Sequence, residues 1–191
     1  MGRTKQLLPL HNGPVIAYCL RNIIASGIKD IVVIIDRNSP ELSEVLGRFP
    51  VKAAFNALPH TEMSDSVRTG LSHIQPSSSG VLVCLSDQPL VAELTFRNLM
   101  LLHRECPDKI LIPMFKGKKG HPTLFPFGTL REIIPDLTLR QIISQDPDRI
   151  RYQDLPDEGV ILDMDTPGDY KMILQKCRTE GNPRHKVRSN V

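Results

Sequence analysis

The sequence predicts an α/β fold built around a mostly parallel sheet, and three observations support that fold class. Two short runs, residues 31–35 and 81–85, are apolar and rich in β-branched residues, as strands buried on both faces are. Segments with a helical apolar repeat lie between and around these runs. Because strand and helix patterns alternate, the helices are expected to connect strands that run in parallel.

Helices are expected in the first half of the chain wherever the apolar repeat has a start or stop signal. Gly27 is in position to end the first of them, at 14–26. The others are expected at 40–48, 64–74 and 92–104, with further strands at 51–56 and 109–114.

The second half of the chain has a different pattern. FKGKKGHP, residues 115–122, is a lysine- and glycine-rich turn that predicts a hairpin or a mobile loop. Beyond it we expect helices at 129–134, 139–145 and 167–176, and short strands at 150–153 and 160–162. The predicted domain is 1–177, followed by a basic tail at 178–191 that is expected to be disordered.

The composition excludes several classes of protein. Hydrophobic residues make up 40% and charged residues 24%, as in ordinary globular proteins. No apolar run could span a membrane and no secretory signal is recognisable, so a cytoplasmic protein without membrane contact is expected. The four scattered cysteines argue against zinc and disulfides. The net charge of +3 equals that of the tail alone, and no nucleic-acid motif accompanies it, so nucleic-acid binding is not expected.

An aspartate follows the second β-branched run. Asp87 lies where the apolar pattern of VLVCLSDQPL stops. In an open parallel sheet, ligands bind beyond the carboxyl ends of the strands, so Asp87 is expected at the binding edge. A helix cap or turn is the alternative interpretation of a lone aspartate at a strand end.

A second acidic cluster, LDMDTPGDY at 162–170, favours a metal site. In an extended segment Asp163 and Asp165 share one face, so one or both can meet Asp87 on a divalent cation. Magnesium is typically held by one or two carboxylates, with phosphate and water completing its shell. The same segment also suits a plain helix start capped by Thr166.

Two further segments carry polar groups. Ser64 and Ser66 begin a predicted helix, where hydroxyls and unpaired backbone N–H groups can bind an anion or the edge of a base. Plain capping is the alternative role of such serines. His121, in the lysine-rich turn, is by itself more often structural than catalytic.

With these motifs in their order along the chain, the sequence resembles the nucleotidyltransferases that complete molybdenum cofactors, in particular the molybdenum cofactor cytidylyltransferases. LSDQP, GHP and LDMDTP at these separations are together fairly specific, whereas the DTP ending recurs across several nucleotidyltransferase groups. The resemblance covers residues 1 to about 177, and five motifs carry it: MGRTKQLLPL followed by Gly13-Pro14, SDSVRTGL, LSDQPLV, GKKGHPTLF and ILDMDTPGDY.

The resemblance implies a Rossmann-like, GT-A-like nucleotidyltransferase fold of three layers. A terminal phosphate of molybdopterin would attack the α-phosphate of CTP, with Mg²⁺ as cofactor and pyrophosphate as leaving group. Asp87 would hold the metal together with Asp165, or with Asp163 in its place, and Lys5 would neutralise the triphosphate. Contacts to the nucleotide are implied for Gly2, Arg3, Ser64 and Ser66, and contacts to the pterin for Gly120, His121 and Pro122.

One part of the family signature is not found. The signature begins with an apolar strand and a glycine-rich loop, L-A-A-G-x-S-x-R-M-G-x-x-K, and this sequence shares only its end, from Met1 to Lys5. We therefore expect the first strand and most of the phosphate-cradling loop to be missing, because the chain either continues upstream of Met1 or is a shortened relative. Three alternatives remain open. The protein could be a guanylyltransferase, a sugar nucleotidyltransferase, or a non-catalytic protein that delivers the cofactor to a molybdenum hydroxylase.

Overall fold

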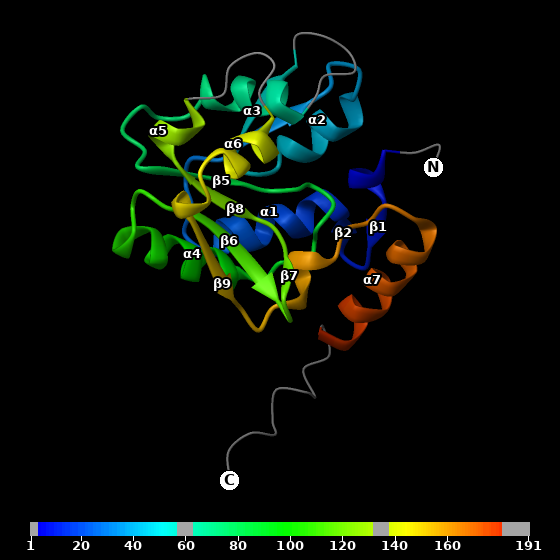
Figure 1. Cartoon of the computed structure of the whole chain (residues 1–191). Helices are drawn as coiled ribbons and strands as arrows, with labels where there is room; N and C mark the ends of the chain where they lie inside the picture. The colour runs from blue at the N-terminus through cyan, green and yellow to red at the C-terminus, as the bar shows by residue number, and fades with distance from the viewer. Residues whose placement is uncertain (1–3, 57–62, 132–137, 181–191) are drawn as a thin grey trace.

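The computed structural model describes residues 4–56, 63–131 and 138–180. Helices surround three groups of paired strands in these ranges (Figure 1). None of the helices in the described ranges is long and apolar enough to cross a membrane. Gly2, Arg3 and residues 181–191 of the predicted tail lie outside the described residues.

The helices and strands follow one another along the chain as follows. The first part contains η1 (Lys5–Leu7), β1 (Pro9–Leu10), β2 (Gly13–Pro14), α1 (Val15–Ala25), β3 (Val32–Ile35), α2 (Pro40–Leu46), β4 (Lys52–Phe55), α3 (Met63–Leu71) and β5 (Gly80–Val83). The second part contains α4 (Glu93–Glu105), β6 (Ile110–Phe115), β7 (Lys118–Lys119), β8 (Thr123–Pro126), α5 (Phe127–Leu130), α6 (Leu139–Gln145), η2 (Pro147–Arg149), β9 (Ile150–Asp154), η3 (Glu158–Ile161) and α7 (Pro167–Glu180).

The main sheet is mixed, which corrects the prediction of a mostly parallel sheet. Its strands lie in the order β5-β8-β6-β7, and β9 also pairs with β6. β8 runs antiparallel to both β5 and β6, whereas β9 is parallel to β6. The physical reason is the short β6–β7 hairpin: the chain reaches β8 through tight turns, without a crossover helix, so β8 enters the sheet reversed. A separate pair, β3 and β4, is parallel.

Alternating residues of β6 pack against helices on both faces of the main sheet. Ile110 and Ile112 belong to a core cluster with side chains of α5 and α6. Leu111, between them, belongs to another cluster with Leu99 and Leu102 of α4. Because successive strand residues point to opposite faces, this arrangement gives a sheet between two helical layers.

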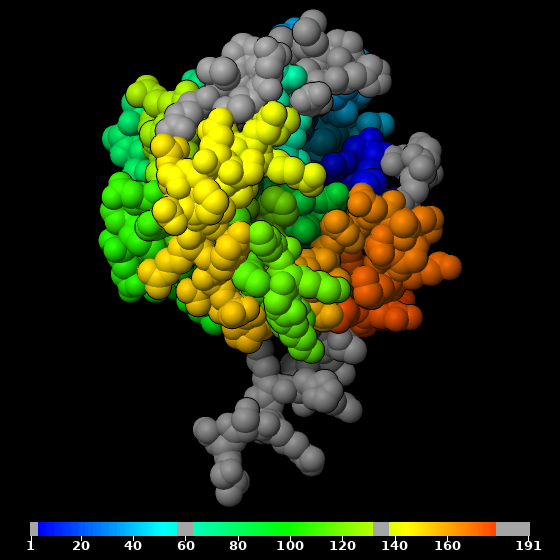
Figure 2. Space-filling model, viewed as in Figure 1, coloured from blue at the N-terminus to red at the C-terminus, as the bar shows by residue number. Residues whose placement is uncertain are grey.

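The β6–β7 hairpin expected from the lysine-rich turn is present at the surface. Figure 2 shows it, in lime green, between residues of β9 and residues of α7. Lys119 fastens it to β9, because its Nζ donates a hydrogen bond to the Tyr152 hydroxyl at 2.7 Å. The predicted hairpin is therefore confirmed.

The predicted strand at 160–162 is wrong, because these residues contribute to the 3₁₀ helix η3 and to the segment after it. The cause is local: the Asp157 carboxylate accepts a hydrogen bond from the Gly159 N–H, which turns the chain. The β1–β2 hairpin was not predicted. The closing helix α7 extends to Glu180, three residues past the predicted domain boundary at 177. Of the helix predicted at 129–134, α5 covers 129–130, and residues 132–134 lie outside the described residues.

Candidate functional site

Lys5 and Asp165 form an ion pair although 160 positions separate them in sequence. Lys5 Nζ donates to Asp165 Oδ1 at 2.6 Å. In Figure 1, η1 lies beside the start of α7, as this contact requires. The hydrogen bond to Asp165 raises the pKa of Lys5, and the negative charges of Asp87 and Asp163 act in the same direction. Lys5 is therefore a fixed positive charge within electrostatic reach of three carboxylates.

Asp87 lies in the loop that follows β5, as the sequence predicted. Gln6 ties the N-terminal segment to this loop, because its Nε2 donates to Ser86 Oγ at 3.0 Å. Burial raises the pKa of the Asp87 carboxyl, and the nearby charges of Asp163 and Asp165 raise it further, whereas Lys5 lowers it. Partly desolvated carboxylates near other carboxylates are typical of sites that bind cations.

The acidic segment before α7 presents two carboxylates and buries the residue between them. Met164 is fully buried, whereas Asp163 and Asp165 are exposed, so the predicted alternation is confirmed. Asp169 has a different role: its carboxylate accepts hydrogen bonds from the Thr166 backbone N–H and hydroxyl, both at 2.7 Å, and so caps the helix. Thr166 caps the helix, as the alternative interpretation expected, because its Oγ1 accepts a hydrogen bond from the Asp169 N–H at 3.2 Å. The Asp165 carboxylate instead pairs with Lys5.

The GHP motif is held against the segment that leads to these carboxylates. His121 donates its backbone N–H to the Val160 carbonyl at 2.8 Å, and the His121–Pro122 peptide bond is cis. Burial lowers the pKa of His121, although Asp87 and Asp163 act to raise it. His121 Nδ1 is buried and has no hydrogen-bond partner among the described residues. The motif thus brings a neutral imidazole with an unused nitrogen to the edge where the carboxylates lie.

Gly120 is in close contact with the same backbone. A Cβ atom added at Gly120 would lie 2.2 Å from the Val160 carbonyl oxygen, far closer than any real contact. The absence of a side chain at this position therefore allows the two segments to touch.

The predicted serines lie on α3, and a residue that the sequence reasoning missed accompanies them. Ser64 is buried, and Ser66 Oγ accepts a hydrogen bond from Asn56 Nδ2 at 3.0 Å. Asn56 follows β4 directly, and its Oδ1 is buried without a partner in the described chain. A polar residue at the end of a predicted strand was the signal that could have identified Asn56.

The carboxylates fit a hard divalent cation that also binds phosphate. Among the described residues, no group of three or more histidine, cysteine, aspartate or glutamate side chains could hold a metal ion unaided. Magnesium does not need such a group, since it is usually held by one or two carboxylates with substrate phosphates and water. The residues that could hold such an ion are Asp87 with Asp165 or Asp163.

A protein-family model with the description MobA-like NTP transferase domain matches residues 1–150. The chain belongs to the MobA-like NTP transferase family. The nucleotidyltransferase family and the α/β nucleotidyltransferase fold expected from the motifs are thereby confirmed. A comparison of the sequence with curated proteins gives no significant match.

Several solved structures resemble this MobA-like chain over most of its length. Rv0371c from Mycobacterium tuberculosis H37Rv, in complex with manganese, is 25% identical, with a TM-score of 0.72 over 91% of this chain and 93% of that one. A Methanothermobacter nucleotidyl transferase, Mth528, is 19% identical, with a TM-score of 0.78 over 92% and 86%. CMP:2-keto-3-deoxy-manno-octonic acid synthetase complexed with CTP is 14% identical, with a TM-score of 0.72 over 94% of each chain. The last two similarities concern the fold alone.

Proposed function

We propose that this MobA-like chain transfers CMP from CTP to a terminal phosphate of a molybdopterin-type cofactor and releases pyrophosphate. The observation that carries the proposal is that the N-terminal segment contacts two distant acidic segments: Lys5 pairs with Asp165, and Gln6 binds Ser86 beside Asp87. The charges of Asp87 and Asp163 also act on Lys5. One positive and three negative side chains in that arrangement suit a metal–triphosphate complex.

The reaction requires alignment and charge compensation more than proton transfer. An oxygen of the acceptor phosphate forms a bond to the α-phosphorus of CTP, and the bond from that phosphorus to the bridging β-oxygen breaks. The electron pair leaves with pyrophosphate. Because the attacking oxygen is already anionic, no general base is needed. A magnesium ion, held by Asp87 with Asp165 or Asp163, would compensate charge on the phosphates.

Lys5 is proposed to exchange one anionic partner for another. Its Nζ lies 2.6 Å from Asp165 Oδ1, and both side chains are partly exposed. A bound triphosphate offers a stronger anion, so Lys5 can move to the phosphates and leave the Asp165 carboxylate for the metal. The hydrogen bond to Asp165 is the main cause of the raised pKa of Lys5, and the charge of Asp87 acts in the same direction.

Asn56 and Ser66 are proposed to contact the base. The unpartnered Oδ1 of Asn56 can accept a hydrogen bond from an exocyclic amine, which cytosine has and uracil lacks. Two observations support CTP as the first nucleotide to test. One is the pair of Asn56 and Ser66, and the other is the CTP complex of a protein with the same fold. The manganese complex of Rv0371c supports a divalent cation.

The direct test is a pyrophosphate-release assay with molybdopterin-type cofactor, Mg²⁺ and either CTP, GTP or UTP. The expected result is release with CTP that requires both the metal and the acceptor. Release with GTP or with a sugar phosphate as acceptor would instead support one of the other transferases. If the cofactor binds but no nucleotide releases pyrophosphate, the chain is a cofactor-binding protein.

Replacing Lys5 with glutamine is expected to weaken CTP binding by about 10- to 100-fold, the loss of roughly 1.5–3 kcal/mol for a hydrogen bond to a charged group. Thermal stability should hardly change, because the ion pair that is lost lies largely in solvent. Isothermal titration with CTP and Mg²⁺ measures the effect. Lys29→Gln, at an exposed lysine outside the site, is the matched control. Equal affinity of the two variants would remove Lys5 from the nucleotide site.

Replacing Asn56 with alanine is expected to reduce discrimination between CTP and UTP by about tenfold, because a polar contact to the base is lost. Stability should be maintained, since the variant also removes a buried oxygen without a hydrogen-bond partner. Titrations of both nucleotides measure the ratio of affinities, with Asn38→Ala at an exposed turn as control. An unchanged ratio would show that Asn56 does not contact the base.

A further inference from the structure

A side chain from a distant segment caps helix α4, which begins shortly after Asp87. The residue at the start of this helix, Ala92, has no side-chain acceptor of its own. Asp157 supplies one, because its Oδ2 accepts hydrogen bonds from the Ala92 N–H at 2.9 Å and from the Thr95 hydroxyl at 2.5 Å. A carboxylate is also favourable at this end of the helix dipole. The cap therefore connects the loop that contains Asp87 to the segment that leads to Asp163.

Backbone contacts join the same two segments. Asp157 Oδ1 accepts a hydrogen bond from the Gly159 N–H at 2.9 Å, which fixes the turn there. A Cβ atom added at Gly159 would lie 2.2 Å from the Leu90 carbonyl oxygen, so the two backbones are in direct contact. Asn22 of α1 holds the loop as well, because its Nδ2 donates to the Val91 carbonyl at 2.8 Å. Polar and backbone contacts thus fix the path of the chain from the aspartate to α4.

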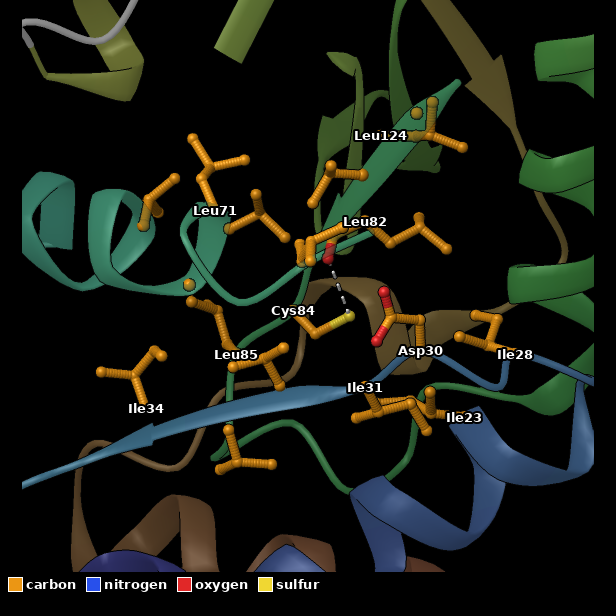
Figure 3. A pocket seen from close by; sticks show the side chains of 18 of the residues that line it. Ile23, Ile28, Asp30, Ile31, Ile34, Leu71, Leu82, Cys84, Leu85 and Leu124 are labelled. Atoms are coloured by element: carbon orange, nitrogen blue, oxygen red, sulfur yellow. Dashed lines mark hydrogen bonds between the residues drawn. The ribbon is translucent and has the colours of Figure 1, made fainter. Parts of the chain in front are cut away.

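The chain that leads to Asp87 has surroundings of another kind. It borders a cavity lined mainly by apolar side chains, where Figure 3 shows Leu82, Cys84 and Leu85 together with Ile34 of β3. Apolar packing is not directional, so it does not set the direction of the Asp87 side chain. The directional contacts after Asp87 are therefore well placed to orient its carboxylate toward the second acidic segment.

A further contact of the Asp157 segment reaches the GHP motif. The Val160 carbonyl accepts the His121 N–H at 2.8 Å. Residues 157–160 therefore join three parts of the candidate site, which are the loop after Asp87, the GHP motif and the acidic segment that begins at Asp163.

We propose that Asp157 is a positioning residue that sets the separation between Asp87 and the carboxylates of Asp163 and Asp165. This role rests on the proposed function, in which these carboxylates share one divalent cation. Asp157 itself does not touch the ion, because its two oxygens are already bound to three donors. Groups that hold metal ligands in place contribute about 10- to 100-fold to metal affinity.

Asparagine cannot replace Asp157 in this arrangement. Both carboxylate oxygens accept hydrogen bonds, Oδ2 from the start of α4 and Oδ1 from the Gly159 N–H. Asparagine has one oxygen, and its NH₂ group would face a donor in either orientation of the amide. At least one donor would lose its partner, so the two segments should move apart.

Mn²⁺ binding to the full chain tests the proposal, with Mn²⁺ alone as the probe and the EPR signal of the free ion as the readout. Asp157→Asn is expected to raise the dissociation constant by about 10- to 100-fold. Glu158→Gln is the matched control for charge, because it removes the neighbouring carboxylate, which pairs with Lys176 at 2.6 Å. This control should bind Mn²⁺ as the wild type does.

Thr138→Ala is the control for stability, because Thr138 caps α6 by accepting a hydrogen bond from the Gln141 N–H. Loss of either cap should lower the melting temperature by about 2–4 °C. The loss at α6 should leave Mn²⁺ affinity unchanged, whereas Thr95→Val should weaken it, because that variant removes a donor to Asp157. Since both changes break the same contact, the double variant of Thr95 and Asp157 should bind Mn²⁺ no more weakly than Asp157→Asn alone.

Two results would overturn the positioning role and leave the metal site in place. Asp157→Asn could bind Mn²⁺ as the wild type does while Asp87→Asn binds it weakly, or Thr138→Ala could lose as much affinity as Asp157→Asn. The second result would mean that lower stability is the cause of the loss. If Asp87→Asn binds Mn²⁺ as tightly as the wild type, the proposed metal site is itself wrong, and the role of Asp157 is overturned with it.

Discussion

Replacing Asp87 with asparagine is expected to reduce the rate of nucleotidyl transfer by about 10²- to 10³-fold, the usual effect of removing one group that compensates charge in the transition state. Asparagine keeps the shape of the side chain but cannot supply the anionic oxygen that a divalent cation needs. The rate of pyrophosphate release at saturating CTP and Mg²⁺ measures the loss. Asp108→Asn, at an exposed aspartate outside the site, should leave the rate unchanged.

The same substitution should not destabilise the protein at neutral pH. Burial raises the pKa of the Asp87 carboxyl, so the folded state favours the protonated form and is disfavoured by the charged form. This contribution to stability is full below the ordinary pKa of aspartate and is lost as the pH rises through the raised pKa. The variant lacks the charge, so its melting temperature at pH 7 should equal or exceed that of the wild type.

Melting temperatures measured from pH 4 to pH 8 test this expectation. The difference between the variant and the wild type should shrink as the pH falls toward the ordinary pKa of aspartate, because Asp87 then becomes protonated in the folded and, increasingly, in the unfolded wild-type protein. A variant that is inactive and also melts several degrees lower at pH 7 would mean that Asp87 has a structural role, as a turn aspartate has.

Replacing Gly120 with alanine is expected to lower both stability and turnover. The added Cβ would lie 2.2 Å from the Val160 carbonyl oxygen, and both groups belong to the backbone, so segments must move apart. Overpacking of this kind costs about 1–3 kcal/mol, or several degrees in melting temperature for a chain of this size. Because Val160 also receives the His121 N–H, the shift would displace His121 from the carboxylates, and a turnover loss of at least tenfold is expected.

Gly128→Ala is the matched control, since a Cβ at Gly128 would meet no atom within 4 Å. In the helix α5 this change should be neutral or stabilising by up to about 1 kcal/mol. Thermal melts and pyrophosphate release with both variants separate the close contact at Gly120 from a general effect of replacing glycine. Equal behaviour of the two variants would show that the contact between the two segments is unimportant.

The sequence predicted those features of the site that depend on local pattern. Asp163 and Asp165 share an exposed face because an extended segment alternates, and Met164 between them is buried. Asp87 lies directly after a buried strand, where an apolar run that ends in a carboxylate indicates a binding edge. The ion pair between Lys5 and Asp165 follows from no local pattern and was expected only as a shared role near the phosphates.

Features that depend on contacts between distant segments could not be predicted. β8 is reversed because of how the hairpin before it packs, and alternation of helices and strands cannot show that reversal. The contact between Gly120 and Val160 joins the segment after β7 to η3, and the sequences of the two segments show no relation. Asn56 was missed because a lone asparagine after a strand is common, and only its bond to Ser66 and its unpartnered oxygen distinguish it.

A crystal structure with Mn²⁺ and a CTP analogue that resists cleavage tests the central claim most directly. The anomalous signal of the metal should lie within about 2.3 Å of a carboxylate oxygen of Asp87 and of Asp165 or Asp163, allowing for an ion larger than magnesium. Lys5 Nζ should have moved from Asp165 to a phosphate oxygen. A metal bound to the triphosphate without contact to Asp87, or a nucleotide bound away from Lys5, would contradict the claim that these residues form one site.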